Sequence, residues 1–509
     1  MPDQQHTSRF YRRFFSLVLR ALLTLAQGIL ALACLWQALQ FTARPDPLDT
    51  LRRGDALFIA GRYHDARATY SQLVAQDSRL ARGYLRQGMV AAIRGEFEVA
   101  SRSLARAVGM GLQGEDRDLA RLYQGYVALQ LGHADEAVAT WQAVDPRSTL
   151  LPVRRVLEGE RLLHAGDYAT AEATFRSVNL DEVPPAWQAI VRNRLAALRA
   201  ASDPQSALAL LQQPGGNMSG TLAPSSAVFV APLLPSGGPN TEALAAALRA
   251  DPGHRPALLG QVYLEGKLYA LAEAQFSAAA ADNAYARSAA AYAAYTRWLA
   301  GDRATGRQQL EALVAAHPDE PSARALLALT LLADAKAQPA QAQLATMQKL
   351  APQAPDTHLA WAQWYAATSD YIAATNEYER AVREAPLAER GVYALAQAQF
   401  HVETEVQVCE TGQPVAEEAA RLLPNNVAAW TTLAAARFRC SNPAGAREAA
   451  RQALKLDPTS AEASYYLGRA LAALGDRPGA RNALVSAADL APDSAWRERA
   501  ETQLGVLGL

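Results

Sequence analysis

The chain has 509 residues, of which 50% are hydrophobic and 7% aromatic, and its 49 Lys and Arg residues balance 50 Asp and Glu residues to a formal net charge of −1. This balance gives no support for a partner selected by charge, such as nucleic acid or a polyanionic substrate. A chain of this length normally divides into about three domains, but an array of repeats can reach it as one continuous unit.

The first 20 residues form a basic segment, and the stretch after it predicts a membrane helix. Four arginines between positions 9 and 20 precede an uncharged run, 21–41. As a helix this run is about 31 Å long, which matches the roughly 30 Å hydrocarbon core of a bilayer. We expect residues 21–43 to form a transmembrane helix or an uncleaved signal anchor. The alternatives are a signal peptide cleaved or lipidated near Cys34 and a helix that packs against the rest of the chain.

The charges around this run also predict an orientation. Arginines dominate before it, whereas Asp46 and Asp49 accompany Arg44 directly after it. Because cytoplasmic flanks carry the excess of Lys and Arg, the chain is expected to cross the membrane once, with everything after residue 43 on the extracytoplasmic side.

A repeating pattern of small and aromatic residues begins at Pro47. In the first unit, Gly61, Tyr63, Ala66 and Tyr70 occupy positions 15, 17, 20 and 24, and similar residues recur in the next three units. Apolar residues spaced three and four apart on both sides of a turn predict two helices per unit. We expect this N-terminal block to span 47–213 and to end in a degenerate unit.

Residues 214–240 interrupt the pattern. They are rich in Gly, Pro and Ser, which is incompatible with a helix pair, and they contain one apolar string, 227–234. We favour a linker that lays this string against the repeats. The alternative is a mobile arm that binds a partner, because long loops without regular structure are often functional.

The repeats resume in a C-terminal block, 241–494, in which proline closes the units. Proline ends a helix because it lacks an N–H group and clashes with the preceding turn. One unit, which we place from Tyr393, is four residues longer, and the charged segment 495–509 predicts a capping helix. The closing prolines are Pro318, Pro352, Pro386, Pro424, Pro458 and Pro492. Successive prolines are 34 residues apart, except for the 38 residues between Pro386 and Pro424.

The unit that starts at position 461 resembles the tetratricopeptide repeat. Leu467 and Gly468 fall at positions 7 and 8, Ala480 at 20, Ala487 at 27 and Pro492 at 32, which are signature positions of that family. The resemblance implies an all-α fold, a right-handed superhelical solenoid of antiparallel helix pairs. Counting the degenerate unit, we expect about twelve repeats, which hide their apolar faces by stacking.

No pattern in the sequence predicts catalysis, a cofactor or a bound metal. The eight histidines are scattered without a His-Glu-x-x-His motif, and we expect them at the surface. Glycine-rich phosphate loops and a Gly-x-Ser-x-Gly elbow are also missing from the sequence. The chain is therefore predicted not to be an enzyme.

Two of the three cysteines, Cys409 and Cys440, fall near the inter-helix turns of successive repeats. They are expected to be neighbours on one edge of the stack. A disulfide between them is one interpretation, and it would be allowed outside the cytoplasm. Two unpaired thiols acting as small apolar residues are the other.

The resemblance implies that partners bind a concave groove built from the first helix of each pair. The Lys and Asn that clamp a terminal carboxylate in some members are missing at the corresponding positions, where aromatic and arginine side chains are frequent instead. Tyr, Trp and Arg are enriched at binding hot spots. The alternative is that these side chains pack between neighbouring first helices, above all Trp298 and Phe438. The predicted groove residues are Tyr126, Tyr295, Trp298, Phe438, Arg439, Tyr465 and Arg469.

Within this set we expect Arg439, Tyr465 and Arg469 to contact an extended or helical segment of a partner protein. The predicted function is that of a membrane-anchored scaffold that assembles or positions an envelope-associated complex by contact area rather than chemistry. Two alternatives stay open: a cytoplasm-facing assembly factor of envelope biogenesis, and a non-catalytic subunit of an enzyme complex that recognises peptide or glycan.

Overall fold

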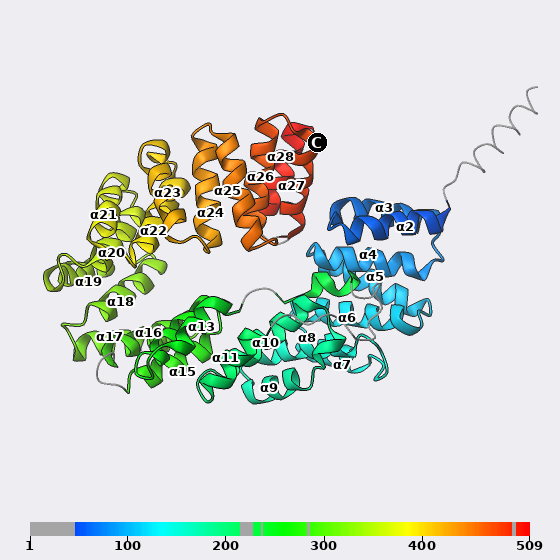
Figure 1. Ribbon diagram of the computed structural model, residues 1–509, viewed down its shortest axis with the longest axis horizontal. Helices are drawn as coiled ribbons and strands as arrows, with labels where there is room; N and C mark the ends of the chain where they lie inside the picture. The colour runs from blue at the N-terminus through cyan, green and yellow to red at the C-terminus, as the bar shows by residue number, and fades with distance from the viewer. Residues whose placement is uncertain (1–45, 214–227, 236–237, 282–285, 491–494, 509) are drawn as a thin grey trace, which may run out of the picture.

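The computed structural model describes residues 46–213, 228–235, 238–281, 286–490 and 495–508. The regular elements in these ranges are helices, stacked side by side into a curved array (Figure 1). This confirms an all-α helical repeat array for the described part of the chain. Within the same ranges, no helix combines the length and apolar character needed to cross a bilayer. The predicted membrane helix, 21–43, and the basic segment before it lie outside the described residues.

Five helix pairs precede the Gly, Pro and Ser-rich segment, and seven follow it in the described ranges. The first five are α2 (Pro47–Ile59) with α3 (Tyr63–Gln76), α4 (Ala81–Ile93) with α5 (Phe97–Gly109), α6 (Gly114–Gln130) with α7 (Ala134–Gln142), α8 (Leu151–His164) with α9 (Tyr168–Arg176), and α10 (Pro185–Arg199) with α11 (Pro204–Gln212).

A single helix, α13 (Thr241–Arg249), starts the second half, and α28 (Ala495–Leu507) ends the array. The seven pairs between them are α14 (Arg255–Glu265) with α15 (Tyr269–Ala279), α16 (Ala286–Leu299) with α17 (Arg303–Ala316), α18 (Pro321–Ala333) with α19 (Ala337–Leu350), α20 (Pro355–Ala367) with α21 (Tyr371–Glu384), α22 (Arg390–Thr404) with α23 (Gln413–Leu422), α24 (Val427–Arg439) with α25 (Pro443–Leu456), and α26 (Ala461–Ala473) with α27 (Arg477–Leu490).

Small residues let the two helices of a pair approach each other closely. Gly125 of α6 lies against the indole of Trp141 in α7, whose Nε1 donates to the carbonyl oxygen of Leu122 at 3.1 Å. A residue with a side chain at position 8 would collide with this ring. The alanines at position 20 face the first helix in the same way and are fully buried: Ala66, Ala100, Ala137, Ala171, Ala446 and Ala480.

A left-handed residue at position 15 makes the turn inside ten of the twelve pairs. Glycine adopts this conformation without strain, whereas other residues pay roughly 1 kcal/mol for it. The turn is therefore set by the packing of the helices and not by glycine alone. The residues with positive φ at this position are Gly61, Gly95, Gly132, Gly166, Lys267, Gly301, Ala335, Ser369, Ser441 and Gly475.

The segment that interrupts the repeats does not interrupt the core. One cluster of buried apolar residues continues from Leu51 to Phe276 and includes Phe229 and Val230 of the inserted segment. Beside them, Asn193 Nδ2 donates to the carbonyl oxygen of Pro239 and to Thr241 Oγ1, both at 3.0 Å, which ties α13 to α10. The array is thus continuous where the sequence suggested a boundary between two blocks.

The four extra residues lie in a turn, and the predicted start of the longer unit at Tyr393 is wrong. Its first helix begins at Arg390, close to the ordinary 34-residue interval. The extra length follows this helix, where Glu405 and Gln407 have positive φ and a π-helical turn, η3 (Val408–Gly412), leads into α23. Proline spacing alone could not place the insertion, because it reports only the total length of the unit.

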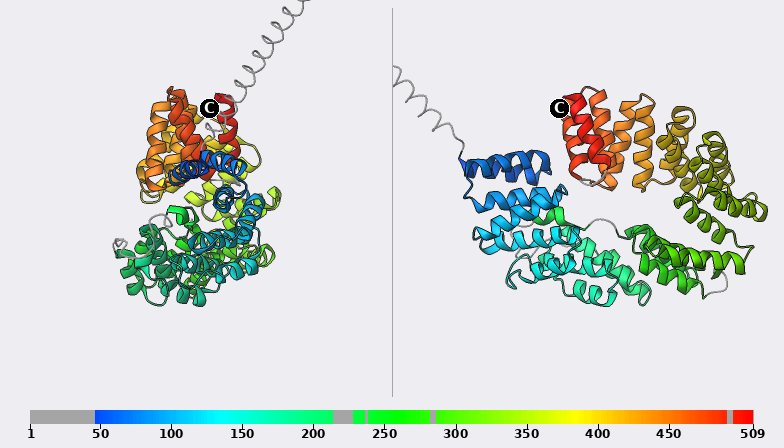
Figure 2. Two further views of the ribbon diagram at one scale, coloured as in Figure 1. Left: turned by 90° about the vertical axis from the view of Figure 1, so that its right-hand side faces the viewer. Right: turned by 180° about the vertical axis from the view of Figure 1, so that it is seen from behind.

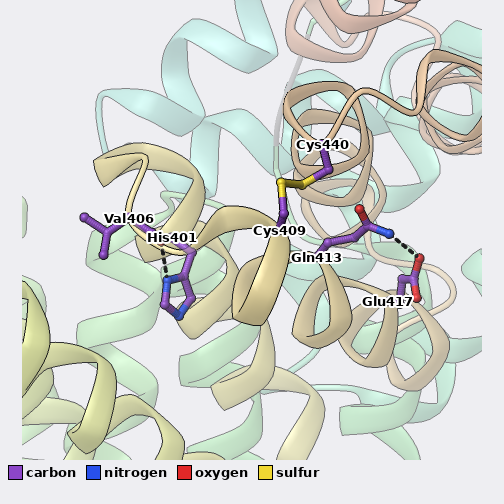
Figure 3. The surroundings of a disulfide bond; sticks show 6 residues. All are labelled: His401, Val406, Cys409, Gln413, Glu417 and Cys440. Atoms are coloured by element: carbon purple, nitrogen blue, oxygen red, sulfur yellow. Dashed lines mark hydrogen bonds between the residues drawn. A yellow bond between two sulfur atoms is a disulfide. The ribbon is translucent and has the colours of Figure 1, made fainter.

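A disulfide ties this inserted turn to the next repeat (Figure 3). Cys409 of η3 is bonded to Cys440 at the C-terminal end of α24, with their Cα atoms 5.4 Å apart. Next to it, His401 Nδ1 donates to the carbonyl oxygen of Val406 at 2.7 Å. Arg439 Nη2 lies 3.3 Å from Glu405 Oε1, so a salt bridge and a covalent bond hold the turn from adjacent positions of α24.

The two ends of the array meet. Figures 1 and 2 show the C-terminal helices α27 and α28 beside the N-terminal pairs, and the carboxylate of Asp489 in α27 accepts a hydrogen bond from the His64 amide of α3 at 2.9 Å. Within the second half, Asn425 Nδ2 donates to Glu242 Oε2 at 3.1 Å and links the turn before α24 to α13. The helix pairs therefore form a closed ring.

Replacing Gly125 with Ala is expected to destabilise the protein by about 1–3 kcal/mol, because the new Cβ would lie 2.2 Å from Trp141 Nε1 and overpack the pair. Gly109→Ala is the matched control, since no atom lies within 4 Å of a Cβ at that helical position. Thermal unfolding followed by circular dichroism measures both. Equal midpoints for the two variants would contradict this account of the packing.

Cys409→Ser and Cys440→Ser should each lower the stability by about 3–4 kcal/mol, the chain-entropy value for a bond between residues 31 apart. The physical reason is that the unfolded chain regains the freedom of that loop. Chemical denaturation with and without reductant provides the measurement. The double variant should lose no more stability than either single variant. If the unfolding midpoint of the wild type is the same with and without reductant, the bond does not stabilise the protein.

Candidate functional site

The C-terminal repeats carry a continuous cluster of aromatic and arginine side chains. Tyr465 and Arg469 lie one turn apart on α26, and Phe438 lies in the last turn of the neighbouring first helix, α24. The guanidinium carbon of Arg469 lies 4.2 Å from the centre of the Phe438 ring and 5.7 Å from that of Tyr465. Such cation–π contacts hold an arginine in place while keeping its charge.

The final helix extends this cluster. The indole of Trp496 in α28 lies 5.5 Å from the Tyr465 ring and 5.9 Å from the Tyr466 ring, measured between ring centres. Arg499 covers the same indole at 4.6 Å and is exposed. We call the five residues Phe438, Tyr465, Arg469, Trp496 and Arg499 the aromatic–arginine ladder.

An acidic side chain lies beside the ladder. Burial raises the pKa of Glu462 above its usual range, Glu403 raises it further, and Arg499 and a hydrogen bond from Thr431 lower it. Burial likewise raises the pKa of Tyr466. Arg469 is half-buried in the same region, so its charge acts more strongly than one on an open surface, whereas Arg499 is exposed.

Sequence reasoning found part of the ladder and missed the rest. Of the predicted cluster of Arg439, Tyr465 and Arg469, the last two lie together, and Phe438, another of the predicted groove residues, lies beside them. Trp496 and Arg499 were assigned to a polar cap, although a tryptophan at the second position of that helix was a signal that its inner face packs on the last repeat. Arg439 instead reaches Glu405 of the inserted turn and so has a structural partner.

The other predicted groove residues lie elsewhere in the array. Tyr126 in α6 packs against the N-terminal core, whereas Tyr295 and Trp298 belong to α16 and stack on each other with 5.9 Å between ring centres. Trp298 is only 8% exposed and is covered by Arg303 at 5.1 Å, which favours the packing interpretation for it. The seven residues therefore do not form one surface.

The apolar string of the inserted segment packs onto the N-terminal repeats. Tyr123 Oη donates to the carbonyl oxygen of Phe229 at 2.7 Å, Arg86 lies 3.7 Å above the Phe229 ring, and Phe58 lies 5.3 Å from it. Val230 is completely buried. These contacts agree with the interpretation of a segment laid against the repeats.

A pocket of about 340 Å³ opens beside Phe229, lined mostly by charged residues. Arg86 Nε pairs with Asp55 at 2.9 Å, and Arg82 Nε pairs with Asp116 at 2.5 Å. Both arginines of this pocket are thus paired with carboxylates, and Glu115 accepts a hydrogen bond from Thr149 Oγ1 at 2.5 Å. Across the described ranges, no three His, Cys, Asp or Glu side chains are grouped so that they could hold a metal ion.

The expectation that the histidines lie at the surface is wrong for two of them. His401 is fully buried on α22, and burial lowers its pKa. His358 is buried on α20, where its Nδ1 lies 2.6 Å from Glu377 Oε2. Both occupy first helices and pair with neighbouring groups, so they serve packing within and between repeats.

Comparison with known proteins identifies one family and several similar folds. Residues 441–503 match the family model described as Tetratricopeptide repeat. No curated protein matches the sequence significantly. The matched family is not one of catalytic domains, and its proteins bind peptides and other proteins.

Three solved structures illustrate the similarity. YrrB, described as a TPR protein with an unusual peptide-binding site, is 20% identical, with 38% of this chain and 97% of that chain covered and a TM-score of 0.32. The Cut9–Hcn1 hetero-tetramer of APC/C is 13% identical, with 92% of this chain and 91% of that chain covered and a TM-score of 0.41. Yeast Tom70 is 13% identical, with 91% of this chain and 95% of that chain covered and a TM-score of 0.37. The family match thus places a tetratricopeptide repeat at residues 441–503, inside an all-α array of helix pairs.

Proposed function

We propose that this protein is a membrane-tethered scaffold that captures a segment of another protein on the aromatic–arginine ladder. The observation that carries the proposal is the alignment of two half-buried rings, Phe438 and Trp496, and two arginines across α24, α26 and α28, with the buried ring of Tyr465 packed beneath them. Tyr, Trp and Arg account for many of the residues that dominate binding energy, because they combine large apolar area with polar groups.

The chemistry of the ladder favours a segment with both acidic and apolar side chains. Arg469 and Arg499 supply two positive charges held against aromatic faces. A carboxylate of the partner can pair with a guanidinium group, while neighbouring apolar side chains cover the rings. Arg439 contributes by fixing the inserted turn rather than by direct contact.

The tether and the side of the membrane are the second part of the proposal. The uncharged run at 21–41 has the length of a bilayer span, and the arginines before it favour a cytoplasmic N-terminus. The Cys409–Cys440 bond supports the same orientation, since disulfides persist mainly in oxidising compartments. We therefore place the repeats outside the cytoplasm, where they would assemble or position an envelope-associated complex.

A site for an enzyme or a glycan-binding subunit in the inserted segment finds no support among residues 228–235 and 238–240. The apolar side chains there are packed into the core, and the charged groups of the adjoining pocket are paired. The scaffold interpretation needs no reactive group, because an array binds through contact area.

Capture of a partner should depend on the arginines of the ladder. After crosslinking in native membranes has identified the partner, the double variant Arg469→Ala with Arg499→Ala is expected to bind the purified partner about tenfold more weakly or worse, as befits two hot-spot residues. Arg451→Ala, on the outward second helix α25, is the control. Equal affinities of the double variant and the wild type would exclude the ladder as the binding site.

The tether makes a separate prediction. The full chain should sediment with membranes and leave them only in detergent, whereas a chain without residues 1–45 should stay in the supernatant, because the apolar run provides the anchor. The orientation is tested separately. A reporter that is active only in the cytoplasm, fused after Leu509, should show no activity. An active reporter would reverse the orientation and favour a cytoplasm-facing assembly factor.

A further inference from the structure

The contact that closes the ring consists of charged groups. Asp489 of α27 pairs with Arg94, which ends α4, and accepts the amide hydrogen of His64. Arg481 Nη2 of α27 lies 2.8 Å from Asp65 Oδ1 of α3.

The final helix adds a third link to the same contact. Arg497 Nη1 of α28 donates to the carbonyl oxygen of Arg94 at 2.7 Å, and its Nη2 lies 3.6 Å from Glu96 Oε1. We call this set, Asp65, Arg94, Glu96, Arg481, Asp489 and Arg497, the ionic latch.

The latch differs in kind from the junctions between neighbouring pairs. Those junctions bury apolar side chains. Among the described residues, no apolar cluster crosses the latch: one cluster runs from Leu51 to Phe276 on the N-terminal side of the contact, and another from Ala394 to Ala500 on the C-terminal side. Burying apolar surface is what holds a solenoid together. The ends of this ring meet without that contribution.

The free energy of such a contact is small. Exposed ion pairs contribute about 0.2–1 kcal/mol each, and the gain from a buried pair is offset by the loss of hydration. Burial raises the pKa of Asp489 to about 6, although Arg94 and the His64 amide lower it. These partners therefore do not fully replace the hydration that the carboxylate loses. Separating the ends therefore costs far less than unfolding a repeat, and it exposes little apolar surface.

We infer that the ionic latch is a reversible clasp, and that the protein exchanges between a closed ring and an open solenoid as this contact forms and breaks. Every helix pair stays folded in both forms. The electrostatic attraction across the latch then determines how far apart the two ends lie. It also determines how much of the inner surface of the ring a folded partner can reach. This inference does not depend on the ladder, because the groups involved are separate from it.

The distance between the ends tests the clasp directly. Spin labels at Ser71→Cys of α3 and Thr502→Cys of α28, both exposed positions outside the latch, report it by double electron–electron resonance. The probe is the full chain in detergent, with Cys34→Ser and the native disulfide intact. Labels at Ser71 and Ser101, which both belong to the N-terminal pairs, give a control distance that opening leaves unchanged.

We expect a short distance at about 50 mM salt and a severalfold larger population of long distances at about 1 M, where the screening length falls to roughly 3 Å. Arg481→Glu, which faces Asp65 with a like charge, should make the long distance dominant at low salt. Adding Asp65→Lys to it should restore the short one. Arg451→Glu changes the net charge equally but lies on α25, away from the latch, and should behave as the wild type.

Three outcomes would overturn the inference. A short distance that is unchanged by salt and by Arg481→Glu would mean a rigid closure. A long distance in every sample would mean that the ends do not meet. A short distance that vanishes when labelled protein is diluted with unlabelled protein would mean that the contact joins two copies. Unchanged helix content by circular dichroism in each variant excludes unfolding as the cause.

Discussion

The close approach of the two helices in each pair is the constraint on which the rest of the structure depends. A glycine or alanine on one helix faces a bulky ring or a branched side chain on the other, as Gly125 faces Trp141. No pair can bury its apolar face alone, so each needs its neighbours, and the array grows until a helix with a polar outer face ends it. The inserted segment obeys the same rule, since Phe229 and Val230 complete the core of the N-terminal pairs.

Helix pairs, turns and the packing positions could be predicted from the sequence because they are local. A 34-residue period fixes which residues face each other within a pair, and the buried alanines at position 20 are where that period places them. The insertion between Pro386 and Pro424 could be counted but not located, because a longer turn within the pair and a longer linker between pairs give the same proline spacing. Packing, rather than glycine, sets several of the left-handed turns, as Ala335 and Ser369 show.

The closure of the ring could not be predicted, because it depends on a small rotation per repeat summed over the whole array. His64 and Asp489 are 425 residues apart in the chain, and neither belongs to a recognisable motif. The candidate site could be predicted only in part. Phe438, Tyr465 and Arg469 follow from the repeat register, whereas Trp496 joins them only because α28 packs back onto α26. Arg439 shows the limit of such reasoning, since its partner Glu405 lies in the one turn that departs from the register.

One continuous core runs from the first repeat through the inserted segment into the second half. Hydrogen–deuterium exchange of the full chain, read by mass spectrometry, can detect this continuity, because protection reports buried and hydrogen-bonded backbone. We expect slow exchange in peptides from α10, residues 228–234 and α14 together, with faster exchange confined to the turns between helices. Rapid exchange of the inserted segment and the helices on both sides of it, beside protected outer repeats, would show two separate arrays and would contradict the account.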